Sequence, residues 1–181
     1  MPKMINWIKI IPLAIFLLLI TLAFSALEND NSESIPSAYI GKKPPALILT
    51  PLGDLPRVTE EDLQPTDNVQ IILVNFWSSW CPPCRAEHPQ LEKFSTMTNV
   101  KIIGVNYKDN PEKTIKWLKD LGNPYKNILI DKDGKISIDW GVYGIPETFI
   151  VNSNGIIKYR HVGAITNETY KKINSIIKQN E

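Results

Sequence analysis

The sequence is poor in the residues that build disulfide frameworks and metal centres. Its 181 residues include only two cysteines and two histidines. Two cysteines exclude a scaffold of several disulfides and a self-sufficient four-cysteine metal site. Two histidines likewise exclude a histidine-rich site. We therefore expect neither a resident metal nor a cofactor.

The sequence also lacks an excess of either charge. Lysine and arginine number 20 and aspartate and glutamate 19, which gives a net charge of +1. Proteins that bind nucleic acids usually carry a basic excess, so this balance argues against that class. The 43% of hydrophobic and 22% of charged residues are typical of a globular domain. At roughly 150 residues per domain, the length predicts one domain with some chain left over.

Charge is missing altogether from Ile10–Leu27, a run that is almost entirely apolar. Such a run, about 18 residues long, is just enough to cross the ~30 Å core of a bilayer. Lys3 and Lys9 precede the run and acidic residues follow it, which predicts that the N-terminus stays in the cytoplasm. We therefore predict an N-terminal transmembrane helix within residues 1–27. A cleavable signal peptide is the alternative, and it would deliver the chain to the same compartment.

The remaining chain divides into a linker and a domain. Residues 28–45 are rich in polar residues and proline and are expected to form an extended linker. Residues 46–181 alternate strand and helix patterns and are expected to form the domain. The expected strands are 70–76, 100–107, 127–130, 148–151 and 156–162, and the expected helices are 84–97, 110–122 and one that begins near 166. This order predicts an α/β fold, in which a central sheet is covered by helices.

Both cysteines lie in the segment Trp80-Cys81-Pro82-Pro83-Cys84, where a buried strand is expected to meet a helix. Two intervening residues allow a Cys81–Cys84 disulfide. A helix N-terminus stabilises a thiolate through its unpaired amide groups and its dipole. We therefore predict that Cys81 is the attacking thiol and that Cys84, one turn further along, is the resolving thiol.

Two other uses of the cysteine pair stay open. An inert structural disulfide would close a very short loop and add little stability. A copper or zinc site would need two further ligands, and His88 and His161 are the only histidines. A non-catalytic metal carrier that uses Cys81 and Cys84 is thus the alternative from a different functional class.

Several motifs together resemble one known family. The segment 73–84 (LVNFWSSWCPPC) resembles the active-site segment of the thioredoxin superfamily, and Pro146 stands where that superfamily has its cis-proline. Three further segments are CRAEHP at 84–89, GVYGIPETF at 141–149 and YRHVG at 159–163. With them, the chain from about Gly41 onward resembles the DsbE/CcmG family, the membrane-anchored thiol–disulfide oxidoreductases of cytochrome c biogenesis.

The resemblance implies a thioredoxin-like fold with a central mixed β-sheet, and a protein that acts as a reductant. In this family a single-pass protein of the bacterial inner membrane holds its catalytic domain in the periplasm. A membrane dithiol donor reduces it, and it passes electrons to apocytochrome c or to the maturation protein that holds it. We expect a monomer. A general or copper-protein-directed periplasmic reductase with the same chemistry is the alternative.

The resemblance also assigns residues for binding a substrate. Pro146 would be cis and would hold the backbone of Ile145 near Cys81, ready to pair with an extended substrate strand. Trp80 would shield Cys81 and form part of the substrate face. Glu147 either lines the active-site groove as an acidic residue or is a solvated charge at the end of a strand.

The sequence leaves two interpretations of the proton-transfer group. Asn75 occupies the place of the buried aspartate of ordinary thioredoxins, and asparagine is neither an acid nor a base. Another group must therefore take the proton of Cys84. Glu87 shares a helix face with Cys84 and is either that proton shuttle or a surface charge. His88 is expected on the helix surface, and Trp77 is expected in the core.

Overall fold

The structure is a computed structural model of the chain. It describes residues 7–28, 37–47, 50–51 and 69–180. The chain forms two compact units, Met1–Ile35 and Pro36–Glu181, which are described separately below.

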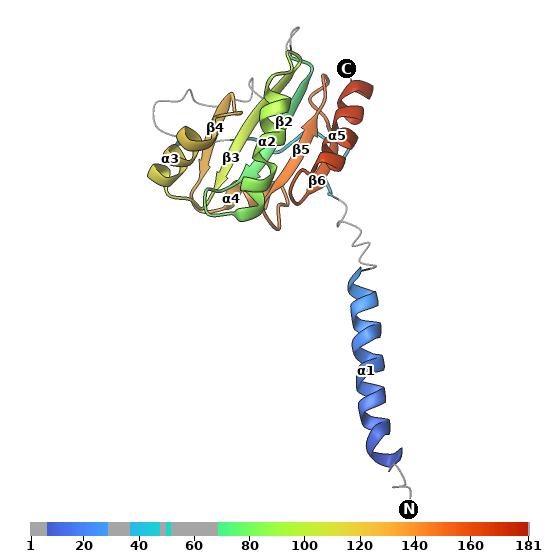
Figure 1. Cartoon of the computed structure of the whole chain (residues 1–181). Helices are drawn as coiled ribbons and strands as arrows, with labels where there is room; N and C mark the ends of the chain where they lie inside the picture. The colour runs from blue at the N-terminus through green and yellow to red at the C-terminus, as the bar shows by residue number, and fades with distance from the viewer. Residues whose placement is uncertain (1–6, 29–36, 48–49, 52–68, 181) are drawn as a thin grey trace, which may run out of the picture. The chain divides into compact units, whose positions relative to one another are not determined.

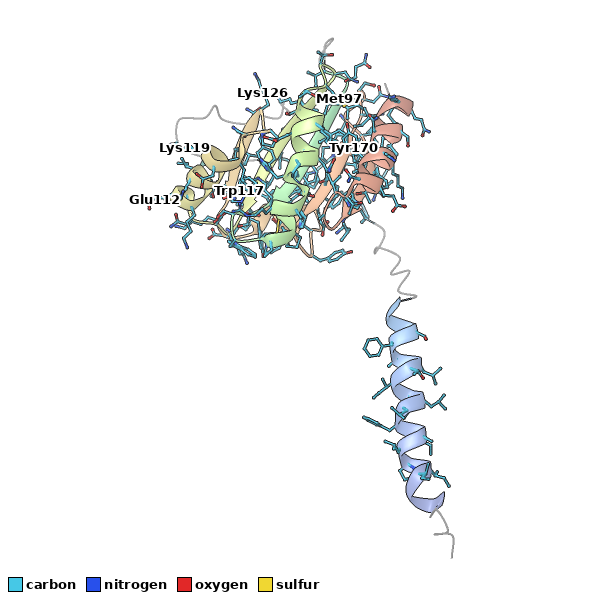
Figure 2. The ribbon with its side chains drawn as sticks, viewed as in Figure 1. Met97, Glu112, Trp117, Lys119, Lys126 and Tyr170 are labelled. Carbon is cyan, nitrogen blue, oxygen red and sulfur yellow. A yellow bond between two sulfur atoms is a disulfide. The ribbon has the colours of Figure 1, made fainter. Side chains whose placement is uncertain are left out.

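The first unit contains one helix, α1, which spans Trp7–Glu28 and includes Pro12. Its described side chains, residues 10–25, are apolar with few exceptions, and they project on all sides of the helix (Figure 2). Over the residues that the structure describes, no helix is long and apolar enough to cross a membrane. The transmembrane helix stays a prediction.

The second unit is built on a mixed sheet. In the described part of the chain it has six strands in the order β1-β4-β3-β2-β5-β6. Figure 1 shows β4, β3, β2, β5 and β6 side by side. The strands are β1 Thr50–Pro51, β2 Ile71–Trp77, β3 Val100–Tyr107, β4 Asn127–Asp131, β5 Glu147–Val151 and β6 Ile157–Val162. Strands β2, β3 and β4 are parallel, and β1, β5 and β6 join antiparallel to their neighbours. The mixed sheet that the resemblance implied is confirmed.

Helices cover both faces of this sheet. They are α2 Pro82–Ser95, α3 Pro111–Leu121, α4 Lys135–Asp139 and α5 Asn167–Gln179. All seven residues of β2 are buried, and successive side chains of a strand point to opposite faces. Leu73 and Trp77 accordingly join the core formed with α2, α3 and α5, while Val74 and Phe76 join the core formed with α4. A central strand buried on both faces explains its continuous apolar sequence.

Two of the expected helices begin at capping residues. The side chain of Asn110 accepts hydrogen bonds from the amides of Glu112 and Lys113 at the start of α3. Thr166 and Thr169 form a reciprocal capping box at the start of α5. These side chains satisfy amides that have no partner within the helix.

Other boundaries differ from the expectation. Helix α2 begins at Pro82, two residues before the predicted start, because proline is well suited to the first helical positions. Helix α4 was not predicted, since its five residues are too short for a helical pattern to be visible. Gly41 and Lys42, which fall in the predicted linker, already exchange backbone hydrogen bonds with Ile157 of β6.

Candidate active site

The two cysteines form a disulfide at the start of α2, which follows β2 in the chain. Their Cα atoms lie 5.3 Å apart. Cys81 is the N-cap of α2, and its Sγ accepts a hydrogen bond of 3.2 Å from the amide of Cys84. Pro82 and Pro83, which occupy the intervening positions, have no N–H to donate. The first amide of the helix is therefore directed at the sulfur of Cys81, where it would stabilise a thiolate after reduction.

The backbone before Pro146 lies beside Cys81. The Ile145–Pro146 peptide bond is cis, as the resemblance implied. The carbonyl oxygen of Ile145 lies 3.8 Å from the Sγ of Cys81. Trp80 is 56% exposed, whereas Cys81 and Cys84 are only 3% and 1% exposed. The structure thus brings these residues together, and their roles in binding a partner stay predictions.

The turn that presents Cys81 is held by a residue that sequence reasoning missed, Asp109. Its carboxylate accepts hydrogen bonds from the amide and hydroxyl of Ser79 at 2.5 and 2.8 Å. It also accepts from the side chain of Asn106 at 3.0 Å and the amide of Asn110 at 2.7 Å. Burial opposes the charge, but these hydrogen bonds outweigh it and lower the pKa of Asp109. In the sequence, Asp109 is hard to distinguish from a second helix cap beside Asn110.

Glu87 is fully buried, so the surface-charge interpretation is wrong. Its carboxylate accepts a hydrogen bond of 2.9 Å from the side-chain amide of Asn75 and one of 3.0 Å from the backbone amide of Ile165. Burial raises the pKa of Glu87 from 4.5 to about 7, and the two hydrogen bonds only partly offset this effect. The group therefore changes its protonation state near neutral pH.

Asn75 links Glu87 to a wider polar network within the core. Its side-chain amide also donates to the hydroxyl of Thr148 at 3.1 Å. Its carbonyl oxygen accepts from the hydroxyl of Tyr125 at 2.9 Å. Burial and the nearby Glu87 raise the pKa of Tyr125 well above its usual value. Asn75 thus orients a buried acid on the neighbouring helix.

Glu147 fits neither of its expected descriptions, because its side chain is fully buried and pairs with Arg160. The Nε and Nη2 atoms of Arg160 lie 2.7 and 2.6 Å from Oε2 of Glu147. Oε1 accepts from the amides of Tyr143 and Gly144, and Nη2 of Arg160 donates to the carbonyl of Gly141. Burial raises the pKa of Glu147, which Arg160 and the two amides counteract. The ion pair therefore fastens the 141–145 loop that leads to Pro146.

The predicted surface position of His88 is also wrong. The ring is buried, its Nε2 lies 3.2 Å from the carbonyl of Leu121, and it packs edge-on against Trp117, which projects from α3 (Figure 2). His88 follows Cys84 by one helical turn and so shares its buried face. Burial lowers the pKa of His88. Trp77 is in the core as expected, stacked 5.1 Å from Tyr125.

Comparison with known proteins agrees with this geometry. The redoxin family model matches residues 51–177. The thiol:disulfide interchange protein DsbE of Escherichia coli K12 is 42% identical over 170 residues, which cover 91% of this chain and 90% of that one. The DsbE of Pseudomonas aeruginosa PAO1 is 42% identical over 166 residues, with 91% and 89% covered.

The fold itself recurs in solved structures. A secreted Mycobacterium tuberculosis disulfide oxidoreductase matches with a TM-score of 0.59 and 20% identity, over 72% of this chain and 93% of that one. The expected thioredoxin-like fold is thereby confirmed. The chain belongs to the redoxin family, among the DsbE thiol:disulfide interchange proteins, and is a thiol:disulfide oxidoreductase.

Proposed function

We propose that this protein is a periplasmic reductant in cytochrome c maturation. Its Cys81–Cys84 dithiol would reduce the haem-site disulfide of apocytochrome c, or a cysteine pair in the protein that holds it. The observation that carries the proposal is the disulfide at the start of α2 beside Ile145 and Pro146, in a chain 42% identical to DsbE. The cytochrome substrate is inferred from the family that the motifs resemble.

The proposed exchange has two steps. The thiolate of Cys81 attacks one sulfur of the partner disulfide, which breaks that bond, forms a mixed disulfide and releases the other partner sulfur as a thiolate. The thiolate of Cys84 then attacks the sulfur of Cys81, so the Cys81–Cys84 disulfide forms and the second partner thiol leaves. Two electrons and two protons pass from the protein to the partner. A membrane dithiol donor returns the protein to its reduced form.

Two features support this assignment of the thiols. Only Cys81 has a helix amide directed at its sulfur, which favours its thiolate as the nucleophile. The sulfur of Cys81 also lies 3.8 Å from the carbonyl oxygen of Ile145, where an extended partner strand could pair. Cys84 lies one turn inside the helix and is bonded to Cys81, so it is in place to resolve the mixed disulfide.

Glu87 is the proposed proton acceptor for Cys84. It lies three residues further along α2, on the same helix face. A pKa of about 7 suits a group that takes up and releases a proton at neutral pH. Asn75 cannot serve as the acid, but it holds the carboxylate in place. Glu147 is not part of this proposal, because Arg160 and two loop amides occupy its carboxylate.

The proposed location is the outer face of the bacterial inner membrane. The uncharged run Ile10–Leu27, with Lys3 and Lys9 before it, supports a single N-terminal anchor and a catalytic domain outside the cytoplasm. A cleaved signal peptide would lead to the same compartment. The oxidising character of that compartment is what makes a dedicated reductant of cysteine pairs necessary.

The experiment that tests the proposal is trapping of the partner. Replacing Cys84 with serine should freeze the mixed disulfide, and the matched Cys81→Ser variant should trap nothing. The trapped protein should be an apocytochrome c or a maturation protein with a cysteine pair. Cells without this protein should lose c-type cytochromes and recover some of them when a small thiol is added. Normal cytochrome content and no such trapped partner would favour a general periplasmic reductase instead.

A further inference from the structure

The side chain of Tyr125 reaches Asn75 across a neighbouring strand. Tyr125 precedes β4, whereas Asn75, which its hydroxyl binds, lies on β2, and β3 runs between these two strands. The residue of β3 that pairs with Asn75 is Gly104. A Cβ atom at Gly104 would lie 2.9 Å from the ring of Tyr125, closer than such atoms approach in proteins. A glycine at this position therefore lets the ring cross β3.

The ring of Tyr125 is fixed on several sides. It is stacked on Trp77, with 13° between the two ring planes. The backbone amide of Tyr125 donates to the side chain of Asn123 at 3.0 Å. The residue is only 5% exposed, and a buried hydroxyl is costly unless it forms a hydrogen bond. The carbonyl oxygen of Asn75 is the acceptor that this hydroxyl needs.

The hydroxyl of Tyr125 determines which way the side-chain amide of Asn75 faces. Because the carbonyl oxygen of Asn75 accepts from Tyr125, its nitrogen is directed at Glu87 and Thr148 and donates to both. The reversed amide would deprive the hydroxyl of its acceptor and would turn an oxygen toward the carboxylate of Glu87. A hydrogen bond received by the carbonyl also strengthens the bonds that the same amide donates. Tyr125 therefore supports the charged form of Glu87.

The surroundings of Glu87 contain few other ionisable groups. The groups that bind it or interact with it electrostatically come from three other elements: Asn75 of β2, the amide of Ile165 before α5 and the phenol of Tyr125 before β4. Cys84 precedes Glu87 by three residues on α2, and its thiol becomes ionisable after reduction. His88, the next residue on α2, packs against Trp117 of α3. The charged residues Glu147 of β5 and Arg160 of β6 pair with each other.

We propose that Tyr125 is a positioning residue in the exchange reaction: it holds the amide of Asn75 as a donor to Glu87 and so controls how readily Glu87 accepts the proton of Cys84. In the second step of the exchange, the thiol of Cys84 gives this proton to the carboxylate of Glu87. The resulting thiolate attacks the sulfur of Cys81. The inference rests on the proposed role of Glu87, and the experiments separate the two.

The first experiment is an NMR titration of the carboxyl carbon of Glu87 in the oxidised full-length protein, in which no thiol takes part. Glu87→Gln identifies the signal. In Tyr125→Phe, which removes only the hydroxyl, the midpoint should lie about one pH unit above that of the wild type, because the carboxylate loses support. Tyr170→Phe is the matched control, because its ring packs on Phe94 of the same helix. It should keep the wild-type midpoint.

A double variant shows whether Tyr125 acts through Asn75. Asn75→Leu removes the amide with little change in size, and it should raise the titration midpoint by itself. Adding Tyr125→Phe to Asn75→Leu should then move the midpoint by less than roughly a third of the shift that Tyr125→Phe causes alone, since residues in one network do not act additively.

The second experiment follows the two thiols separately. The reduced full-length protein reacts with dithiobis-nitrobenzoate, an aromatic disulfide that releases a coloured thiolate at each step. The first release reports the attack by Cys81, and the second, which does not depend on the reagent concentration, reports the attack by Cys84. In Tyr125→Phe the pH midpoint of the second release should rise by about one unit, and that of the first should not change.

Three results would overturn the inference. One is an unchanged titration midpoint in Tyr125→Phe, and another is a full additional shift in the Asn75→Leu background. The third is a raised titration midpoint with an unchanged second release, because Glu87 would then not take the proton of Cys84. A protein that shows the expected shifts but traps no cytochrome-maturation partner would keep this inference and lose the proposed function.

Discussion

Glu87 and Asp109 are two acidic residues near the cysteines, and their surroundings shift their pKa values in opposite directions. Asp109 receives four hydrogen bonds, which favour its charged form. Glu87 receives two and is fully buried, so its neutral form is favoured. One carboxylate is thus suited to holding the turn before Cys81, and the other to exchanging a proton.

We expect Glu87 to make the stability of the oxidised protein depend on pH. Because burial raises its pKa in the folded state from the ordinary value of 4.5 to about 7, the folded state keeps a proton that the unfolded state loses. The free energy of unfolding should therefore fall as the pH rises from about 5 to about 8, by about 2 to 3 kcal/mol from this group. Urea denaturation across this range should show the decline in the wild type and not in Glu87→Gln.

A matched variant on the same helix controls for this prediction. Glu92 has a side chain that is 47% exposed, so Glu92→Gln should keep the wild-type decline. A decline of equal size in Glu87→Gln would show that another group is responsible.

We expect Asp109→Ala to loosen the turn before Cys81. The amide of Ser79 and the side chain of Asn106 would lose their acceptor, at a cost of about 1–3 kcal/mol in the free energy of unfolding. Asp109→Asn should recover part of the loss, because one acceptor oxygen stays. Asp120→Ala, which removes an exposed pair with Lys116, should cost less than about 1 kcal/mol. Equal losses in the two alanine variants would refute the role of Asp109.

At the scale of elements, the 141–145 loop depends on the hairpin that follows it. Strands β5 and β6 pair Glu147 with Val162 and Phe149 with Arg160. Glu147 and Arg160 are thus diagonal neighbours on the sheet, close enough for long side chains to meet. The hairpin therefore positions an arginine to bind the glutamate that anchors the loop.

We expect removal of either partner of this ion pair to be costly. Arg160→Met would leave a buried carboxylate without its cation and should lower the free energy of unfolding by about 3–5 kcal/mol. Glu147→Leu should cost a similar amount, and the double variant should cost less than the sum of the two. Urea denaturation of the wild type, the two single variants and the double variant completes a double-mutant cycle. If the losses in the free energy of unfolding simply add, the two residues are not coupled.

Part of this arrangement was predictable from the sequence. The apolar run of β2 and the helix starts near 110 and 166 each have a local signal in the sequence, and each appears close to its expected place. The buried carboxylate of Glu87 is bound by Asn75 and Ile165, which are 12 and 78 residues away in the chain. No local sequence pattern therefore indicates that Glu87 is buried. The pairing of Glu147 with Arg160 depends on a register shift at Ile150 and Val151 in the pairing of β5 with β6, which the predicted hairpin does not contain.

At the scale of the whole chain, the family assignment extends beyond the catalytic unit. The match to DsbE covers 91% of the chain, whereas the redoxin family model covers residues 51–177. The N-terminal run Ile10–Leu27 therefore largely belongs to the part that this relative shares. This extent supports treating the run as a functional segment, and it makes the orientation of the chain testable.

We expect the C-terminus to lie outside the cytoplasm. Lys3 and Lys9 before the apolar run should keep the N-terminus inside. An alkaline phosphatase fused after Glu181 should therefore be active in a bacterium, because that enzyme needs an oxidising compartment for its disulfides. A reporter that is active only in the cytoplasm, fused at the same position, is the control. Activity of the cytoplasmic reporter alone would reject this orientation.

The polar network around Glu87 joins residues that are synthesised at different times. Asn75 and Thr148 are separated by 73 residues, and Glu87 and Ile165 by 78. A ribosome that makes the chain from its N-terminus therefore releases both cysteines well before the residues that complete their surroundings. During that interval the cysteine pair is accessible to oxidants and thiols, and we expect that it can react before folding is complete.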